Sequence, residues 1–101
     1  MASVMRMRWD GVTPEQYDEL RPLAQWENDY PEGAIFHVAY FTDGGINVID
    51  VWDSPQQFDS FMETRLGPAI AQVGVAGQPD VQWYPAHAVF NPQALAAGAP
   101  A

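Results

Sequence analysis

The sequence predicts an α+β domain of the ferredoxin-like type, in which one antiparallel sheet carries two helices on one of its faces. Three observations support this prediction. Four short segments have the apolar pattern of strands, and two longer segments have apolar residues at helical spacing. Their order along the 101-residue chain is β-α-β-β-α-β. This length suits one domain with one core, which we expect to occupy residues 1–90.

The first strand and the first helix follow each other closely. Residues 3–9, SVMRMRW, alternate with period two, which predicts a strand. Thr13 is a typical N-cap, with Pro14 at the first helical position and Gln16 placed to complete a capping box. Pro22 removes a backbone donor and should kink the helix. Its apolar side chains that share one face are Tyr17, Leu20, Leu23 and Ala24.

A hairpin is predicted over residues 34–42 and 45–52, joined through the sequence TDGG. A two-residue turn needs positive φ angles, which Asp-Gly or Gly-Gly supplies. The turn residues are therefore Asp43-Gly44 or Gly44-Gly45, and the two choices differ by two residues in register. Because side chains alternate with period two, both choices place the same residues on each face.

The second helix begins at Ser54, with Pro55 next and Gln57 placed for another capping box. Gly67-Pro68 interrupts the helical pattern, so we expect a bend or a break there. The apolar face of this helix consists of Phe58, Phe61, Met62, Ala69, Ile70 and Val73.

The last strand is predicted over residues 81–90, VQWYPAHAVF. Pro85 cannot donate to a ladder, which indicates an edge position or a bulge. Residues 91–101 form a low-complexity tail that we expect to be disordered or to lie on a partner.

Composition excludes several classes of protein. Thirteen acidic residues stand against four arginines and no lysine, a formal charge of −9, which disfavours binding to nucleic acid or to an anionic membrane. Cysteine is absent, which excludes disulfides, thiolate metal sites and a cysteine nucleophile. No segment approaches the ~18 apolar residues of a membrane span, and the N-terminus lacks a signal-peptide core, so we expect a cytoplasmic protein.

Both faces of the predicted hairpin are apolar, although two helices on one side cover only one face. A second copy of the sheet is the simplest cover for the other face, so we expect a homodimer that closes an α/β barrel. The apolar residues are Val38, Ile49 and Val51 on one face and Ile35, Ala39, Val48 and Trp52 on the other.

The segment VIDVWDSPQQFDSFMETRLGPAI, residues 48–70, carries a family resemblance. Its strand ends in Trp52-Asp53-Ser54, and the helix that follows carries Phe58 and Phe61. In this arrangement the segment resembles the corresponding part of proteins in the dimeric α/β-barrel superfamily. More narrowly, residues 3–90 resemble small antibiotic-biosynthesis-monooxygenase-like proteins, which would place the chain in secondary metabolism.

This resemblance implies several activities, because the superfamily includes cofactor-free monooxygenases of aromatic polyketides, isomerases and haem-handling enzymes. Trp52 matches the pocket tryptophan of the polyketide monooxygenases. Their asparagine lies an even number of residues earlier, whereas Asn47 lies an odd number before Trp52 and should point to the opposite face. The histidine that haem-degrading members carry on the second helix is absent here.

Strand parity places His37, Asp50 and Trp52 on one face of the hairpin in either register. If Asp43-Gly44 makes the turn, His37 lies directly opposite Asp50. A buried aspartate needs a partner, and beside a histidine it stays ionised and fixes the imidazole tautomer. The pair is then a candidate general base. The alternatives are a structural ion pair, or pairing of Asp50 with Arg6 or Arg8 of the neighbouring first strand.

Other residues are candidate substrate contacts. His87 shares the parity of Trp83 and would lie near the dimer interface, and Arg65 is placed to meet an anionic group. The two histidines have no local metal-ligand spacing, so no metal site is predicted, although one histidine could ligate haem. The candidate pocket walls are Trp52, Tyr40, Trp26, Tyr17, Phe58, Phe61 and Trp83.

Three hypotheses follow for function. The first is an enzyme without a cofactor that takes a proton from an apolar, aromatic metabolite, followed by monooxygenation, cyclisation or isomerisation. The absence of phosphate-loop, dinucleotide and zinc motifs favours this route. The second is a non-enzymatic dimer that binds a hydrophobic ligand or partner, and the third is a haem-binding protein.

Overall fold

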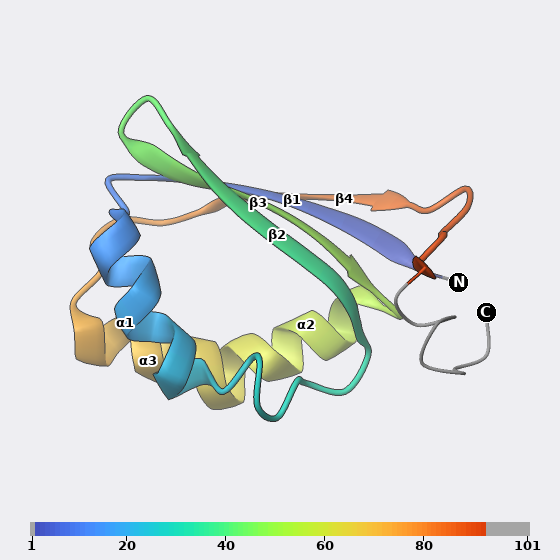
Figure 1. Cartoon of the computed structure of the whole chain (residues 1–101), viewed down its shortest axis with the longest axis horizontal. Helices are drawn as coiled ribbons and strands as arrows, with labels where there is room; N and C mark the ends of the chain where they lie inside the picture. Colours follow the sequence, from blue (N-terminus) through green and yellow to red (C-terminus); the bar gives the residue numbers. More distant parts are fainter. Residues whose placement is uncertain (1, 93–101) are drawn as a thin grey trace.

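The computed structural model describes residues 2–92 and has the predicted ferredoxin-like fold. Its four strands pair antiparallel in the order β2-β3-β1-β4, and the helices lie together on one face of this sheet (Figure 1). The strands are β1 (Ser3–Asp10), β2 (Ala34–Thr42), β3 (Gly45–Trp52) and β4 (Asp80–Pro85). The helical elements are α1 (Pro14–Ala24), α2 (Pro55–Phe61), the π-helical turn η1 (Met62–Leu66) and α3 (Gly67–Val73).

Helix α1 begins with the predicted capping box. The backbone N–H of Gln16 donates to Thr13 Oγ1 and the backbone N–H of Thr13 donates to Gln16 Oε1, both at 3.1 Å. Pro22 lies in the last turn, and the helix ends two residues later at Ala24, followed by the C-cap Gln25, whose φ of 60° is left-handed. Leu23, which was expected to share a face with Tyr17 and Ala24, is 38% exposed.

The β2–β3 hairpin has Asp43 and Gly44 as its turn residues, with φ angles of 48° and 73°. These are the positive values that a type I′ turn requires. The turn pairs Thr42 with Gly45 and therefore His37 with Asp50, which confirms the first of the two registers. A register shift near Ile35 ends the regular alternation, so the parity argument does not extend to that residue.

The second helix differs from its prediction at both the start and the middle. Ser54 makes no capping bond to the backbone; its hydroxyl donates to Gln57 Oε1 at 3.1 Å, so the predicted capping box is wrong. The interruption expected at Gly67-Pro68 is a π-helical turn, in which the N–H of Gly67 donates to the carbonyl of Met62. A Cβ at Gly67 would lie 2.8 Å from that oxygen, so this close approach requires glycine.

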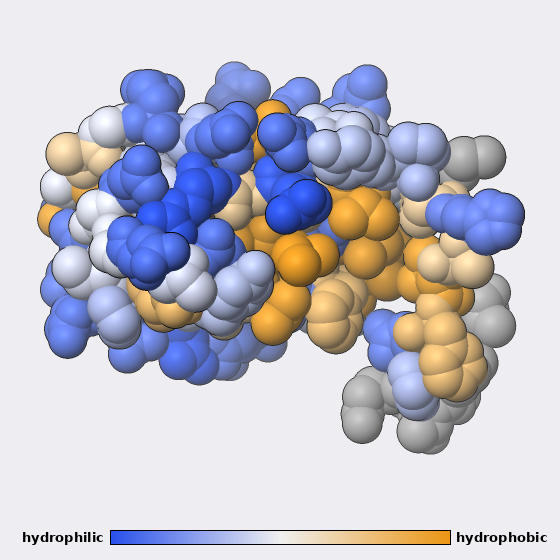
Figure 2. All heavy atoms as spheres, turned by 90° about the horizontal axis from the view of Figure 1, so that it is seen from above, coloured by the Kyte–Doolittle hydropathy of each residue, from blue (hydrophilic) through white to orange (hydrophobic). Residues whose placement is uncertain are grey.

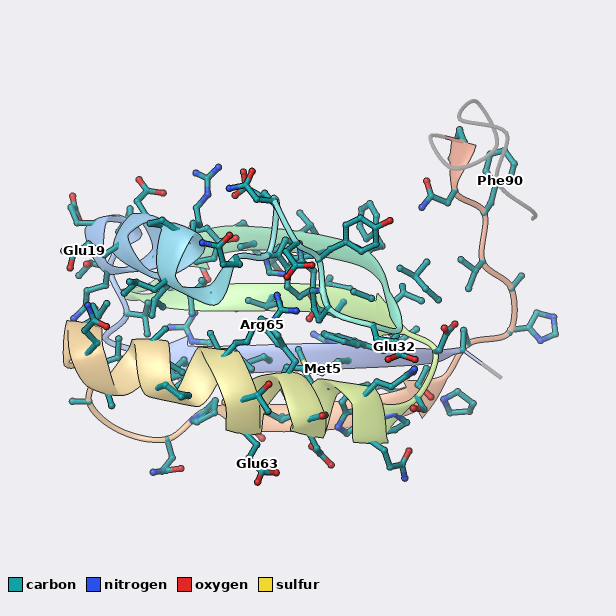
Figure 3. All side chains as sticks on the ribbon, turned by 90° about the horizontal axis from the view of Figure 1, so that it is seen from below. Met5, Glu19, Glu32, Glu63, Arg65 and Phe90 are labelled. Carbon is teal, nitrogen blue, oxygen red and sulfur yellow. The ribbon has the colours of Figure 1, made fainter. Side chains whose placement is uncertain are left out.

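Strand β4 ends at Pro85, five residues before its predicted end. Pro85 pairs with Ser3, the first residue of β1, and beyond this pair a single backbone bond, from Ala86 N to Ala2 O at 2.9 Å, joins the two segments. The chain beyond leaves the sheet, and in Figure 3 Phe90 stands away from the body of the protein. The edge position indicated by Pro85 is confirmed, because β4 is an outer strand. Of the predicted tail, residues 93–101 lie outside the described part of the chain.

The two faces of the sheet have different surroundings. The helix-covered face holds the core, which consists mainly of Met5, Met7, Trp9, Ile46, Val48, Trp52, Phe58 and Phe61. The other face is open, and Figure 2 shows apolar side chains gathered on it beside polar ones. The large apolar side chains exposed there are Phe36, Val38, Tyr40 and Tyr84. Among residues 2–92, no helix is both long and apolar enough to cross a bilayer.

Candidate active site

A histidine–aspartate pair lies on the covered face, between the sheet and the helices. His37 of β2 and Asp50 of β3 are directly opposed, and His37 Nδ1 is 2.6 Å from Asp50 Oδ1. Asp50 is only 2% exposed. Its second oxygen, Oδ2, accepts a bond of 3.0 Å from the indole N–H of Trp52. Both carboxylate oxygens therefore have partners, which offsets the cost of burying the charge.

Tyr17 extends this pair into a hydrogen-bonded chain. Its hydroxyl oxygen, carried on the second turn of α1, is 2.7 Å from His37 Nε2, and the two rings are nearly parallel, at 3°. Burial raises the pKa of Tyr17 above its ordinary value of 10.0, so the hydroxyl keeps its proton at neutral pH. Tyr17 O–H therefore donates to Nε2, and His37 Nδ1–H donates to Asp50. The sequence had placed Tyr17 only among the pocket walls.

The chain borders a cavity of about 90 Å³ between the sheet and the helices. Tyr17, His37 and Asp50 are among its lining residues, and Arg21 of α1 reaches it too. Figure 3 shows Met5 between the two layers. The apolar lining consists of Met5, Met7, Trp9, Val12, Leu20, Ala24, Ile46, Val48, Leu66, Ile70 and Val75, together with three aromatic side chains described next. Such a lining suits a small apolar molecule with one reactive group.

Three predicted pocket walls, Trp26, Phe58 and Phe61, line this cavity. The Trp26 ring centroid is 4.6 Å from that of His37 and 5.6 Å from that of Trp52. Trp52 is fully buried and holds Asp50. Trp83, which belongs to β4, packs its ring against that of Phe58, with a centroid distance of 5.7 Å.

Three other predicted contacts lie elsewhere. Tyr40 projects from the open face and is 47% exposed, because its parity is opposite to that of His37. His87 follows the end of β4 and is exposed. Arg65 contacts Asp29, with Nη1 donating to the backbone oxygen at 2.5 Å and Nη2 lying 3.6 Å from Oδ2. None of the three lines this cavity, so their contact with a substrate stays a prediction from the sequence.

The alternative partners of Asp50 are also excluded by parity. Met5 pairs with Asp50, whereas the side chains of Arg6 and Arg8 alternate onto the open face. Arg8 binds Asp10 at 2.8 Å instead. Asn47 lies on the open face too, as its odd spacing from Trp52 predicted, and its side chain donates to Thr42 Oγ1 at 2.7 Å.

The cation at the cavity is Arg21, which the sequence analysis did not single out. Its guanidinium is held by the Glu27 carboxylate, with contacts of 2.5 and 3.0 Å, and this pairing raises the pKa of Arg21 and lowers that of Glu27. The pair is exposed and helps to fix the loop that follows α1. No motif marks Arg21, because its position at the cavity depends on how α1 lies on the sheet.

The site does not fit haem ligation. An iron ligand needs an imidazole nitrogen with a free lone pair. In His37, one nitrogen contacts Asp50 and the other contacts Tyr17. Among residues 2–92, no cluster of three His, Asp or Glu side chains could hold a metal ion. What the arrangement can do is accept and return a proton at the edge of an apolar space.

These features define an α+β protein of ferredoxin-like fold with a buried acid–base chain beneath its helices. Solved structures, among them two described as antibiotic biosynthesis monooxygenases, share this fold, as the sequence resemblance predicted. One of the similar structures is SnoaB, a cofactor-independent oxygenase from Streptomyces nogalater. It is 12% identical in sequence, the match covers 88% of this chain and 95% of that chain, and the TM-score is 0.59. Another is Rv0793 from Mycobacterium tuberculosis. It is 15% identical, the match covers 90% of this chain and 100% of that chain, and the TM-score is 0.61.

A third similar structure, NE2512 of Nitrosomonas europaea, is described as a protein of unknown function. It is 18% identical, the match covers 90% of this chain and 94% of that chain, and the TM-score is 0.62. No family model matches the sequence. No curated protein is significantly similar to it in sequence. At such identities the likenesses establish the fold, and the case for an activity must come from the site itself.

Proposed function

We propose that the protein is a cofactor-independent enzyme that removes a proton from a small apolar, aromatic molecule, in the manner of a monooxygenase. The observation that carries the proposal is the buried His37–Asp50 pair beside an apolar cavity. An imidazole that donates one N–H to a carboxylate can take up a proton at its other nitrogen. The carboxylate then stabilises the imidazolium that forms.

The reaction begins with transfer of a proton from an acidic C–H or O–H group of the substrate to the base system. The substrate becomes an enolate or phenolate, and His37 becomes an imidazolium paired with the Asp50 carboxylate. Dioxygen is the co-reactant: a methylene group and one O₂ give a carbonyl and one water, with all four electrons supplied by the substrate. The name of SnoaB, a cofactor-independent oxygenase of the same fold, supports this choice.

Hydrogen–deuterium exchange tests the proton step without dioxygen. The probe is 2-indanone, a small aromatic ketone with acidic methylene groups, in D₂O under nitrogen, followed by NMR. We expect the wild type to accelerate exchange and His37→Gln to lose about 100-fold of that acceleration. The control is His87→Gln, because His87 is exposed and does not line the cavity. Equal exchange rates for His37→Gln and the wild type would refute the proposal and leave a binding protein.

Measurement of dioxygen consumption then distinguishes the reactions that the substrate anion can undergo. The monooxygenase proposal expects O₂ uptake, followed with an oxygen electrode, and label from ¹⁸O₂ in the product. Exchange without uptake or label would instead favour the cyclase or isomerase alternative, in which the proton returns to another atom.

We further propose that the protein forms a homodimer through the open face of the sheet. Phe36, Val38, Tyr40 and Tyr84 expose 39–51% of their surface there, and Ile49 and Val51 lie among them, partly buried. A contiguous apolar surface of this kind is typical of an interface. Sedimentation at micromolar concentration tests the proposal, and a monomer there would contradict it.

A further inference from the structure

We infer that Tyr17 is the catalytic residue that exchanges the proton with the substrate, and that His37 and Asp50 form the base behind it. This inference rests on the proposed function and assigns its first proton acceptor. It follows from the order of the hydrogen-bonded chain, in which the hydroxyl of Tyr17 occupies His37 Nε2 and Tyr17 itself lines the cavity.

Both ring nitrogens of His37 already have hydrogen-bond partners. Its Nδ1 is 2.6 Å from Asp50 Oδ1, and its Nε2 is 2.7 Å from the Tyr17 hydroxyl oxygen. A neutral imidazole has one donor and one acceptor nitrogen, and both are used here. The imidazole therefore has no lone pair to offer a substrate directly. The Tyr17 oxygen, in contrast, donates one bond and keeps acceptor capacity.

The charge state of Tyr17 depends on the groups around it. Burial is the largest cause of its raised pKa; Glu27, Asp50 and Asp18 raise it further, and Arg21 lowers it. The phenol is consequently protonated at neutral pH and can pass its own proton to Nε2 while it receives another. It acts as a relay, and no free phenolate has to accumulate in the apolar surroundings.

The proton transfers of this relay balance. A C–H or O–H bond of the substrate breaks and its proton bonds to the Tyr17 oxygen, while the original phenolic proton moves to His37 Nε2. The products are the substrate anion, a neutral Tyr17, a cationic His37 and the unchanged Asp50 carboxylate. Reversal of the two transfers returns a proton to the product, so the protein is restored without a cofactor.

The hydroxyl of Tyr17 is positioned by its neighbours. The Tyr17 ring packs edge-on against Phe41 at 6.2 Å and lies parallel to the His37 ring. The first turn of α1 is fixed by its capping box, and Tyr17 N donates to Thr13 O at 3.0 Å. The hydroxyl is thus held by both the helix and the sheet. Apart from His37, Asp50 and Arg21, the rest of the cavity lining is apolar, which favours an uncharged aromatic acid such as a phenol or an enolisable ketone.

A chromogenic phenol tests the inference. The probe is 4-nitrophenol, whose anion is yellow and whose neutral form is not; its bound fraction is measured by quenching of tryptophan fluorescence, because Trp26 borders the site. In the wild type we expect the apparent pKa of the bound probe to fall by about one unit, a tenfold gain in anion. Tyr17→Phe should bind the probe and lose this shift, as should His37→Gln.

The matched control is Tyr40→Phe, which removes the same hydroxyl from the open face and should behave as the wild type. A wild-type shift that persists in Tyr17→Phe but disappears in His37→Gln would overturn the relay and leave the proposed base intact. No shift in the wild type would overturn the proposed proton abstraction itself.

Nitrogen NMR of the imidazoles gives a second measurement that does not depend on the colour of the probe. The chain has two histidines, so His87→Gln assigns the signals of His37. Binding of 4-nitrophenol should protonate His37 in the wild type but not in Tyr17→Phe. Equal protonation in both proteins would show that Tyr17 only positions the ring and would refute the inference.

Discussion

The two faces of the sheet differ in how their polar groups are satisfied. The covered face contains a chain of side chains, from Tyr17 through His37 and Asp50 to Trp52, in which each polar atom has a partner. Within residues 2–92, no buried side-chain nitrogen or oxygen lacks a hydrogen bond. The open face has exposed apolar side chains beside Arg6 and Arg8.

This difference arises between neighbours in the sequence. Asp50 is almost fully buried, and the next residue, Val51, belongs to the open face. Alternation along one strand therefore supplies the reactive group to one side and an apolar contact to the other. We infer that the covered face is built for chemistry and the open face for association.

Removal of the buried carboxylate should have the largest effect on stability. Asp50→Ala leaves His37 Nδ1 and the indole N–H of Trp52 without acceptors, and we expect a loss of about 3–5 kcal/mol in the free energy of unfolding. Urea denaturation measures this. The control is Asp53→Ala, which removes an exposed carboxylate and should change stability by less than about 0.5 kcal/mol. Similar losses for the two variants would contradict the distinction between buried and exposed carboxylates.

The same substitution on each face compares their packing directly. Phe61→Ala, at a side chain 5% exposed in the cavity wall, should cost about 3 kcal/mol and enlarge the cavity. Phe36→Ala, at a side chain 51% exposed, should cost less than about 1 kcal/mol within the monomer. Chemical denaturation of both variants at low protein concentration measures the difference, and a larger loss for Phe36→Ala would refute the assignment of the core.

A charge on the open face should act on assembly more than on folding. Val38→Lys places an ammonium group where a second copy would pack, and we expect dimer affinity to fall by about 100-fold with the fold retained. Sedimentation equilibrium and circular dichroism measure the two effects. The control is Glu63→Lys, a substitution of an exposed residue on the helical side of the molecule (Figure 3). An equal loss of affinity in this control would indicate a general charge effect.

The smallest expected effect is the pH dependence that arises from Tyr17. Its raised pKa means that folding favours the protonated phenol, so its contribution to stability is present below pH ~10 and declines as pH rises through the folded-state pKa. Tyr17→Phe should therefore lose less stability than the wild type on going from neutral to strongly alkaline pH. Thermal melts across this range measure it, with Tyr40→Phe as the control. A pH dependence as steep in Tyr17→Phe as in the wild type would contradict the prediction.

The sequence by itself determined the bounds of the hairpin strands and which of their side chains share a face. It limited the turn to Asp43-Gly44 or Gly44-Gly45, and both choices placed His37 and Asp50 on one face. The structure has the first turn, which sets His37 directly opposite Asp50. The bounds of β2 and β3 were predicted without error. These predictions succeed because turn conformation and strand alternation depend on residues close together in the chain.

Only the tertiary structure decided which other groups join the pair. Tyr17 lies 20 residues before His37, and its hydroxyl reaches Nε2 because of how α1 packs on the sheet. Likewise, β4 ends at Pro85 because β1 begins at Ser3, and neither limit is visible in β4 alone. Packing of a helix on a sheet is decided by all the side chains between them at once. Local patterns therefore identify the His37–Asp50 pair, whereas the contact of Tyr17 with this pair depends on the assembled core.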